Sequence, residues 1–257
     1  MIYGLYLSAS GVLANSYRVD VISNNLANSE TTGFKRSLAL FQQRRTEAQE
    51  LGNPSDPRTN KLLEPLGGGL QIAPTFVDQS QGTLETTNNN LNAGIYGKGF
   101  FAVKTGNETR LTRNGAFMVD RQGSLILADG SEHKVLDNNG NPINLGNTPQ
   151  SQISIGKDGT ISLNNQPVAK LGFFDVPDPS RLQQVGSTML GFQGDLRSLS
   201  AGTGTIVAGH LENSNVDPTT ELTQLIDTQR QLEANANMIR MQDQSLSRLV
   251  NDVAKIG

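Results

Sequence analysis

Apolar side chains recur at a fixed interval near the N-terminus of the chain. They occupy every seventh position, at Leu5, Val12, Val19 and Leu26. A seven-residue repeat places side chains on one narrow face of an α-helix. Thr31-Thr32-Gly33 is a suitable stop for that helix, so the pattern predicts about 24 helical residues. A face this narrow cannot cover a globular core by itself.

The C-terminal segment carries a longer repeat with a clear start. Asp217 suits an N-cap, Pro218 suits the first helical position, and Glu221 favours the start of a helix. Neither Gly nor Pro occurs between Thr219 and Ile256, so we predict about 36 helical residues. The seam alternates steps of three and four through Leu222, Leu225, Gln229, Leu232, Ala236, Ile239, Asp243, Leu246, Val250 and Val253. A helix of this length needs a partner.

The middle of the chain has a different composition and shorter apolar runs. Residues 46–70 hold three prolines and a run of three glycines, which is typical of a linker or loop. From about residue 71 to 211 the apolar runs are short, and turn-forming pairs such as Asp129-Gly130 and Asn139-Gly140 separate them. This pattern predicts a compact all-β domain, with a stable core of roughly residues 70 to 210.

These segments together predict an α+β fold. Paired N- and C-terminal α-helices would form a coiled-coil-like inner domain from residues 1–35 and 216–257. Residues 36–70 would form a linker or loop, and residues 71–215 the central all-β domain. Because the β-domain is separate, we expect it to remain folded in a chain that lacks residues 1–35.

The terminal seams allow two interpretations. They could form an intramolecular hairpin that caps the β-domain, or they could bind other copies of the chain. The N-terminal seam is shorter and would leave much of the C-terminal helix uncovered, which favours intersubunit packing. The expected assembly interface is Leu5, Val12, Val19, Leu26, Leu222, Leu225, Leu232, Ala236, Ile239, Leu246, Val250 and Val253. The polar residues Asn24, Asn25, Asn28, Gln229, Asn235 and Asn237 fit either registry contacts between subunits or a solvated helix face.

The composition argues against several classes of function. With 21 basic and 24 acidic residues the net charge is -3, so no basic field for a nucleic acid is expected. The absence of cysteine removes disulfides, thiolate metal sites and cysteine nucleophiles. The first basic residue after Met1 is Arg18, so the N-terminus lacks the charged start of a cleavable secretion signal.

Candidate chemistry is weak throughout the sequence. Gly97–Ala102 superficially matches a dinucleotide fingerprint, but a strand-like run follows it, where a phosphate-binding helix would be needed. Asp137–Pro142 has its glycine two positions too early for a calcium loop and reads as a turn. His133 and His210 lie far apart, without a nearby carboxylate cluster. We therefore expect no enzyme activity, no cofactor, no metal site and no small-molecule substrate.

Four ordered motifs nevertheless carry a family resemblance. They are residues 7–11 with 20–28 and 31–35, residues 80–84, residues 97–101 with 112–117, and residues 209–217 leading into 221–222 and 229–235. Together they resemble the flagellar basal-body rod and hook family. The family-motif residues are Asn24, Asn25, Leu26, Ala27, Asn28, Thr32, Gly33, Phe34, Gly209, Glu212, Ser214, Asn215, Val216, Gln229, Arg230 and Glu233. At Leu232 the family commonly carries an aromatic ring.

The resemblance implies a structural subunit of the flagellar rod. Its terminal helices would form an inner tube domain, and copies would stack helically around an axial export channel. The implied partners are copies of the chain, other rod, hook and ring proteins, and the flagellar type III export apparatus. The implied location is the periplasm-spanning rod of the basal body, reached without a cleavable signal peptide. Residues 111–115 and 238–243 are more similar to proximal than to distal rod members.

The rival hypothesis is a secreted adhesin or glycan-binding β-module on a helical stalk.

Overall fold

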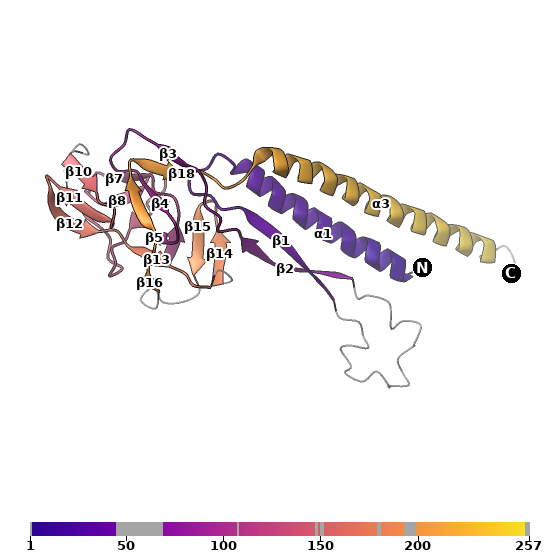
Figure 1. The fold of residues 1–257 in the computed structure, drawn as a ribbon. Helices are drawn as coiled ribbons and strands as arrows, with labels where there is room; N and C mark the ends of the chain where they lie inside the picture. Colours follow the sequence, from indigo (N-terminus) through magenta and orange to yellow (C-terminus); the bar gives the residue numbers. More distant parts are fainter. Residues whose placement is uncertain are drawn as a thin grey trace. The chain divides into compact units, whose positions relative to one another are not determined.

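The computed structural model describes residues 2–44, 69–106, 108–146, 149, 152–178, 181–192 and 199–254. The chain divides into two compact units, each of which is described by itself. The helical unit comprises Met1–Leu26, Leu38–Thr75 and Pro218–Gly257. The β-rich unit comprises Ala27–Ser37 and Phe76–Asp217. Figure 1 shows the two terminal helices and the strands of the central region.

The α+β class predicted from the sequence is confirmed. Helix α1 spans Ile2–Ala27 and helix α3 spans Pro218–Ala254, with 26 and 37 residues respectively. Asp217 immediately precedes α3, and Glu221 lies in its first turn, where a carboxylate complements the helix dipole. Within the described residues, neither helix combines the length and the hydropathy that a membrane-spanning segment needs.

A two-stranded sheet corrects the predicted linker. β1, Ser37–Gln43, pairs with β2, Leu70–Val77. β1 lies inside the segment assigned to a linker or loop. Its sequence, Ser-Leu-Ala-Leu-Phe-Gln-Gln, has neither glycine nor proline and contains an aromatic residue, which favours a strand. Residues 45–68, the rest of that predicted linker, lie outside the described residues.

The β-rich unit is built from short antiparallel strands, as the turn pairs predict. The largest sheet has nine strands, in the order β14-β15-β6-β5-β9-β8-β7, with β13 added on β5 and β16 on β13. The other sheets are β10-β11-β12, β17-β4 and β18-β3. The bounds are β3 Leu84–Thr86, β4 Ala93–Tyr96, β5 Phe100–Thr105, β6 Glu108–Thr112, β7 Phe117–Val119, β8 Leu125–Leu127, β9 Lys134–Val135, β10 Ile153–Ile155, β11 Thr160–Leu163, β12 Gln166–Lys170, β13 Phe173–Asp175, β14 Leu182–Val185, β15 Met189–Phe192, β16 Ser200–Ala201, β17 Thr205–Ala208 and β18 His210–Glu212.

The segment that resembles a calcium loop is a turn, as its spacing predicts. The Asp137 carboxylate accepts hydrogen bonds from the backbone N–H groups of Asn139 and Asn141, both at 2.8 Å. Gly140 closes the turn with a φ of 83°, a left-handed conformation that glycine adopts without strain. The aspartate oxygen is therefore used to hold its own loop.

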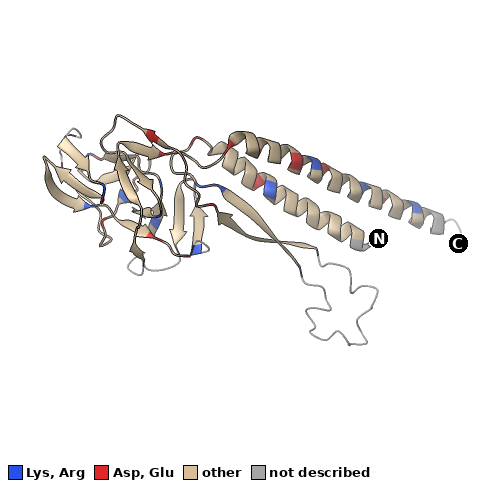
Figure 2. Cartoon of the chain, in the orientation of Figure 1, with Lys and Arg blue, Asp and Glu red and all other residues tan. Residues whose placement is uncertain are grey.

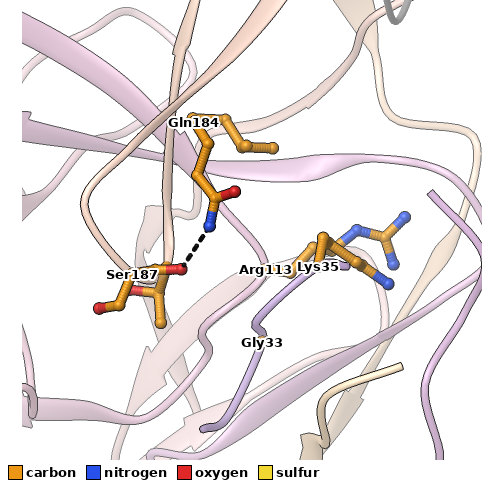
Figure 3. Close-up of a pocket in the computed structure, with 7 residues that line it drawn as sticks. Gly33, Lys35, Arg113, Gln184 and Ser187 are labelled. Carbon is orange, nitrogen blue, oxygen red and sulfur yellow. Dashed lines mark hydrogen bonds between the residues drawn. The ribbon is translucent and has the colours of Figure 1, made fainter. Parts of the chain in front are cut away.

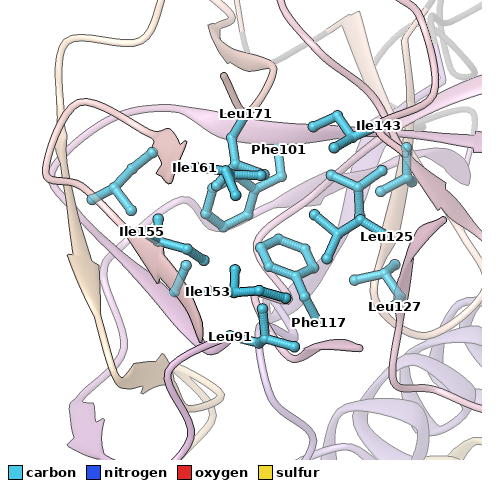
Figure 4. Packing of buried hydrophobic residues seen from close by; sticks show 14 of the residues in the cluster. Leu91, Phe101, Phe117, Leu125, Leu127, Ile143, Ile153, Ile155, Ile161 and Leu171 are labelled. Atoms are coloured by element: carbon cyan, nitrogen blue, oxygen red, sulfur yellow. The ribbon is translucent and has the colours of Figure 1, made fainter. Parts of the chain in front are cut away.

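The main core of the β-rich unit lies among its sheets (Figure 4). The rings of Phe101 and Phe117 pack edge to face, with their centroids 5.2 Å apart. Branched side chains such as Leu125, Ile153 and Ile161 surround them and are almost fully buried. Each such side chain contributes roughly 1.5 to 3 kcal/mol when it leaves water. The unit therefore has a core of its own, independent of the terminal helices.

Candidate assembly site

The two terminal helices contact each other within the helical unit. The Asn25 side-chain amide donates a buried hydrogen bond of 3.3 Å to the Glu221 carboxylate. A Cβ added to Gly4 would lie 2.9 Å from Nε2 of Gln242, and one added to Gly11 would lie 2.8 Å from Nδ2 of Asn235. Helices α1 and α3 thus run antiparallel, with N-terminal residues of α1 beside C-terminal residues of α3 (Figure 1).

The apolar residues of the predicted interface are not buried in the single chain. Those that are half-buried are Leu5, Val12, Val19, Leu26, Leu225, Leu232, Ala236, Ile239 and Leu246. Leu222 is 49% exposed and Val250 is 67% exposed. The side chain of Val253 lies outside the described residues. The predicted seam therefore keeps much of its apolar surface open.

Other side chains are the most buried ones on the helices. On α1 these are Ser8, Ala14, Ile22 and Asn25, and on α3 they are Glu221 and Thr228. Four of these six residues are polar, so a search for apolar repeats could not find them. The overlooked signal is that Gly4 and Gly11 are also seven residues apart. Small residues at such a spacing allow two helices to approach closely.

Several large apolar side chains lie exposed on the helices beside the predicted seam. They are Tyr6, Leu7, Leu13, Ile226, Met238, Met241 and Leu249. Basic and acidic residues are interspersed between them along α3 (Figure 2). The family-motif residues Gln229, Arg230 and Glu233 are exposed on the same helix. Scattered exposed apolar residues are ordinary, but several of them on the same two helices give these helices a partly apolar surface.

A second cluster lies inside the β-rich unit and centres on the Glu212 carboxylate. Its Oε1 accepts hydrogen bonds from Lys35 Nζ at 2.6 Å and from the Gly82 backbone N–H at 3.0 Å. Its Oε2 accepts a hydrogen bond from Arg113 at 2.9 Å. The side chains of all three charged residues are almost completely buried. We call Lys35, Gly82, Arg113 and Glu212 the junction.

The backbone around the junction is equally tight. The Gly33 N–H donates a 2.7 Å hydrogen bond to the Glu212 carbonyl. Gly33 has a φ of 70°, and an added Cβ would collide with the backbone nitrogen of Asn114. This position therefore requires glycine on two grounds. Phe34, the next residue, is completely buried. The segment that follows α1 is thus built into the β-rich unit.

Asn215 makes a parallel set of contacts. Its Oδ1 accepts the backbone N–H of Arg36 at 2.7 Å, and its Nδ2 donates to the carbonyls of Asp78 and Ser80, both at 3.1 Å. A neighbouring hydroxyl, Ser214 Oγ, accepts the backbone N–H of Val216 at 3.2 Å. These bonds join residues from both ends of the chain to the segment that precedes β3.

Burial and charge pairing act in opposite directions on the junction. Burial lowers the pKa of Lys35, and the adjacent Glu212 carboxylate opposes that shift. Arg113 adds a hydrogen bond of 2.8 Å to the Gly97 carbonyl and lies 5.0 Å from the centroid of the Phe100 ring. The Glu212 carboxylate thus pairs with both Lys35 and Arg113, and Arg113 is also held by the Gly97 carbonyl and the Phe100 ring.

A small cavity borders the junction (Figure 3). Gly33, Lys35 and Arg113 line one part of it, while Gln184 and Ser187 line another. Gln184 donates a hydrogen bond of 3.3 Å to the Ser187 carbonyl across that second part. The cavity volume is about 10 Å³, which is space for roughly one water molecule. It cannot accept a metabolite.

Family models match three segments of the chain. "Flagella basal body rod protein" matches residues 5–35, "Flagellar hook protein FlgE/F/G D1 domain" matches residues 94–163, and "Flagellar basal body rod FlgEFG protein C-terminal" matches residues 207–252. The flagellar basal-body rod protein FlgG of Bacillus subtilis is 32% identical over 98% of this chain and 99% of its own length. The chain belongs to the flagellar basal-body rod protein family.

Further rod-family relatives match along nearly the whole chain. FlgG of Buchnera aphidicola subsp. Schizaphis graminum is 34% identical over 97% of this chain and 99% of its own length. The flagellar basal-body rod protein FlgF of Caulobacter vibrioides is 29% identical, with 91% of each chain covered. These names do not say which part of a rod each protein builds, so the expected similarity to proximal members stays a prediction.

The junction unites the three segments that the rod-family models match. Lys35 comes from the first segment, Arg113 from the second and Glu212 from the third. Of the predicted motif residues, Glu212 belongs to the junction, Gly33 donates to its carbonyl and Asn215 accepts the N–H of Arg36. Gln229, Arg230 and Glu233 lie apart on α3. Sequence reasoning placed Arg113 and Gly82 in family motifs but gave neither of them a site role.

The remaining candidates form no reactive constellation in the described parts of this rod-family chain. His133 Nδ1 lies 2.9 Å from the Thr105 hydroxyl, and His210 Nε2 lies 3.1 Å from the Thr86 hydroxyl. Among the described residues, no group of three His, Asp or Glu side chains could hold a metal ion. An open groove of about 560 Å³ beside Tyr96 is lined mainly by apolar residues of β17 and β10, with Lys157 as its charged member.

Proposed function

We propose that this chain is a structural subunit of the bacterial flagellar rod that assembles with copies of itself through its terminal helices. The membership of the rod family supports the rod assignment. The observation that carries the assembly mechanism is the apolar surface that the helices leave open, including Leu222 and Met241. Burial of such surface is the main favourable term in association, and each half-exposed Leu or Met contributes about 1 kcal/mol.

The proposed assembly surface consists of exposed neighbours such as Met241 and of twelve seam residues. The seam residues are Leu5, Val12, Val19, Leu26, Leu222, Leu225, Leu232, Ala236, Ile239, Leu246, Val250 and Val253. In the assembled state the helices of each chain would form a coiled-coil-like inner domain, from residues near 1–35 and 216–257. Neighbouring chains would cover the apolar side chains that one chain leaves half-buried. The β-rich unit would be presented outside this domain.

The proposal includes further partners and a location. As a rod component the subunit would contact other rod, hook and ring proteins, and the flagellar type III apparatus would export it without a cleavable signal peptide. It would reside in the periplasm-spanning part of the basal body. The function is mechanical and structural, with no catalysis, cofactor or small-molecule substrate. We keep similarity to proximal rod members as part of the proposal.

The adhesin hypothesis receives no support from the relatives, which are all named as rod proteins. Assembly state separates the two hypotheses. An adhesin on a helical stalk would form a small oligomer of fixed size. A rod subunit would be monomeric alone and open-ended in its assembly, because a heterologous contact that does not close generates a helical polymer.

One pair of substitutions tests the assembly surface. Met241 is 60% exposed on α3, and Gln244, one turn along, is also exposed. Met241→Glu places a charge where a neighbouring chain would bury a methionine, so we expect loss of rod incorporation and of motility. Gln244→Glu adds the same charge at a polar position and should preserve motility. Both variants should melt as the wild type does. Full motility of the Met241→Glu strain would refute the proposed surface.

A further inference from the structure

The contacts between α1 and α3 follow one spacing. From Gly4 to Gly11 the chain advances seven residues, and from Gln242 to Asn235 it goes back seven. The Asn25 to Glu221 hydrogen bond lies fourteen residues further in each direction. A single antiparallel register therefore accounts for all three contacts. The same step places Arg18, which is exposed, opposite Thr228, which is 2% exposed.

The chemistry of these positions differs from that of an ordinary helical seam. The α3 positions hold Glu221, Thr228, Asn235 and Gln242, which are all polar. A seam made of leucines tolerates a shift by one heptad, because leucine then meets leucine. A polar residue at a seam position specifies the register at a cost in stability. Polar side chains seated against glycines do so by shape as well as by hydrogen bonding.

A shift by one heptad would break this arrangement. If Asn25 faced Thr228, it would lose the carboxylate that accepts its amide proton in a buried site. If Arg18 faced Asn235, a long cationic side chain would occupy the space that Gly11 leaves for the amide. Both consequences disfavour the shifted pairing and leave the observed one.

We propose that Gly4, Gly11 and Asn25 of α1 and Glu221, Asn235 and Gln242 of α3 form a ladder that fixes the antiparallel register of the two helices within one chain. The ladder has a second effect. Successive side chains on a helix point about 100° apart, so a residue next to the ladder such as Leu222, which is 49% exposed, points to a different side of its helix. The ladder thereby reserves the apolar seam for contacts outside the chain.

The ladder specifies geometry without adding much affinity. It buries glycines and amides, which gain little from leaving water compared with leucine or isoleucine. Gln242 Oε1 is buried and has no hydrogen-bond partner within the part of the chain that the structure describes. Burial of an unpaired amide oxygen is unfavourable. The helix pair in an isolated subunit is thus correctly aligned but weakly held.

Engineered disulfides test the register directly, because the chain has no cysteine of its own. The in-register variant combines Gly11→Cys with Asn235→Cys. The matched control combines Gly11→Cys with Gln242→Cys, whose partner lies about 10 Å further along the axis, beyond the roughly 7 Å limit between bridged Cα atoms. Both full-length variants carry Gly11→Cys, and the control also keeps the Asn235 amide, which the new Cβ would meet at 2.8 Å. The readout is the rate of intrachain disulfide formation in dilute subunit under mild oxidation, by non-reducing gels and peptide mass spectrometry.

We expect the in-register pair to close at least tenfold faster than the control. Equal rates, disulfides between chains in place of those within one chain, or no disulfide in either variant would overturn the ladder. A second reporter, Arg18→Cys with Thr228→Cys, leaves every ladder residue intact and should also close rapidly. Adding Gly11→Leu to that reporter should slow closure several-fold, and an unchanged rate would also contradict the proposal. These measurements need no rod, so they are independent of the proposed function.

Discussion

Lys35 and Glu212 are 177 residues apart in sequence and form a buried ion pair of 2.6 Å. Lys35 follows the N-terminal helix and Glu212 lies just before the C-terminal one. The pair therefore closes the β-rich unit by tying its first segment to its last. Breaking a buried pair leaves an uncompensated charge, which costs far more than breaking a pair at the surface.

Glu212→Gln should lower the free energy of unfolding of the β-rich unit by about 3 to 5 kcal/mol, because two buried cations lose their carboxylate. The measurement is urea denaturation followed by a probe of the β-rich unit. Glu108→Gln is the control, since Glu108 pairs with Arg110 at 3.0 Å on the surface. We expect that control to cost less than about 1 kcal/mol. Equal losses in the two variants would contradict a closing role for Glu212.

Gly33→Ala should destabilise the chain more than Gly140→Ala does. Both glycines have a positive φ, 70° and 83° respectively, so each alanine carries the strain of a left-handed backbone, about 1 to 2 kcal/mol. Only at position 33 would the new methyl group meet backbone atoms, because nothing lies within 4 Å of the Cβ position at Gly140. Thermal melting of both variants gives the comparison. A Gly33→Ala melt no lower than that of Gly140→Ala would show that the close approach is relaxed in solution.

The pH dependence of stability should reveal Lys35. Its pKa in the folded chain is below the ordinary value of 10.5, chiefly because of burial. Between the lowered pKa and 10.5 the unfolded chain binds more protons at this site, so this residue makes folding more favourable as pH rises. The stability difference between the wild type and Lys35→Met should therefore move in favour of the wild type between pH 8 and pH 10. Denaturant midpoints at the two pH values measure it, and a constant difference would argue against the lowered pKa.

Two truncated chains measure separately how α1 and the junction contribute to the stability of the β-rich unit. A chain that starts at Ala27 keeps the whole β-rich unit and should melt near the full-length value. A chain that starts at Arg36 lacks Phe34 and Lys35 and should melt several degrees lower, since loss of a buried phenylalanine alone costs about 3 to 5 kcal/mol. The β-domain should still remain folded without residues 1–35, as the sequence predicts, but with a lower melting temperature. Identical melting of the two truncated chains would contradict a stabilising role for Phe34 and Lys35.

The sequence alone predicts both terminal helices. The signals are local, because caps, heptad repeats and the absence of glycine and proline act over a few turns. The short strands follow from pairs such as Asp129-Gly130. The sequence did not predict which residues join the two helices within one chain, since hydrophobicity selects the Leu5 repeat, which was assigned to contacts between chains, and overlooks Gly4. A glycine contributes to a helix contact by leaving room for a side chain of the partner helix. This role can be recognised only when the position of the partner helix is known.

The junction could not be predicted from local sequence patterns. Lys35 and Glu212 are charged residue types that are ordinarily exposed, and no periodicity relates positions 177 residues apart. The family motifs identified both neighbourhoods without pairing them. β1 was assigned to a linker because the prolines and glycines further along outweighed a single seven-residue strand.

The closed junction determines how the β-rich unit would carry a mechanical load. A force pulling residue 33 away from residue 216 acts first on the Gly33 and Arg36 backbone hydrogen bonds and on the Lys35 ion pair. All the sheets of the described residues lie in the chain segment between Arg36 and Asn215 that these bonds close into a loop. The sheets would stay free of tension until the junction ruptures. Tension would thus bypass most of the β-rich unit and pass through a few residues around one carboxylate.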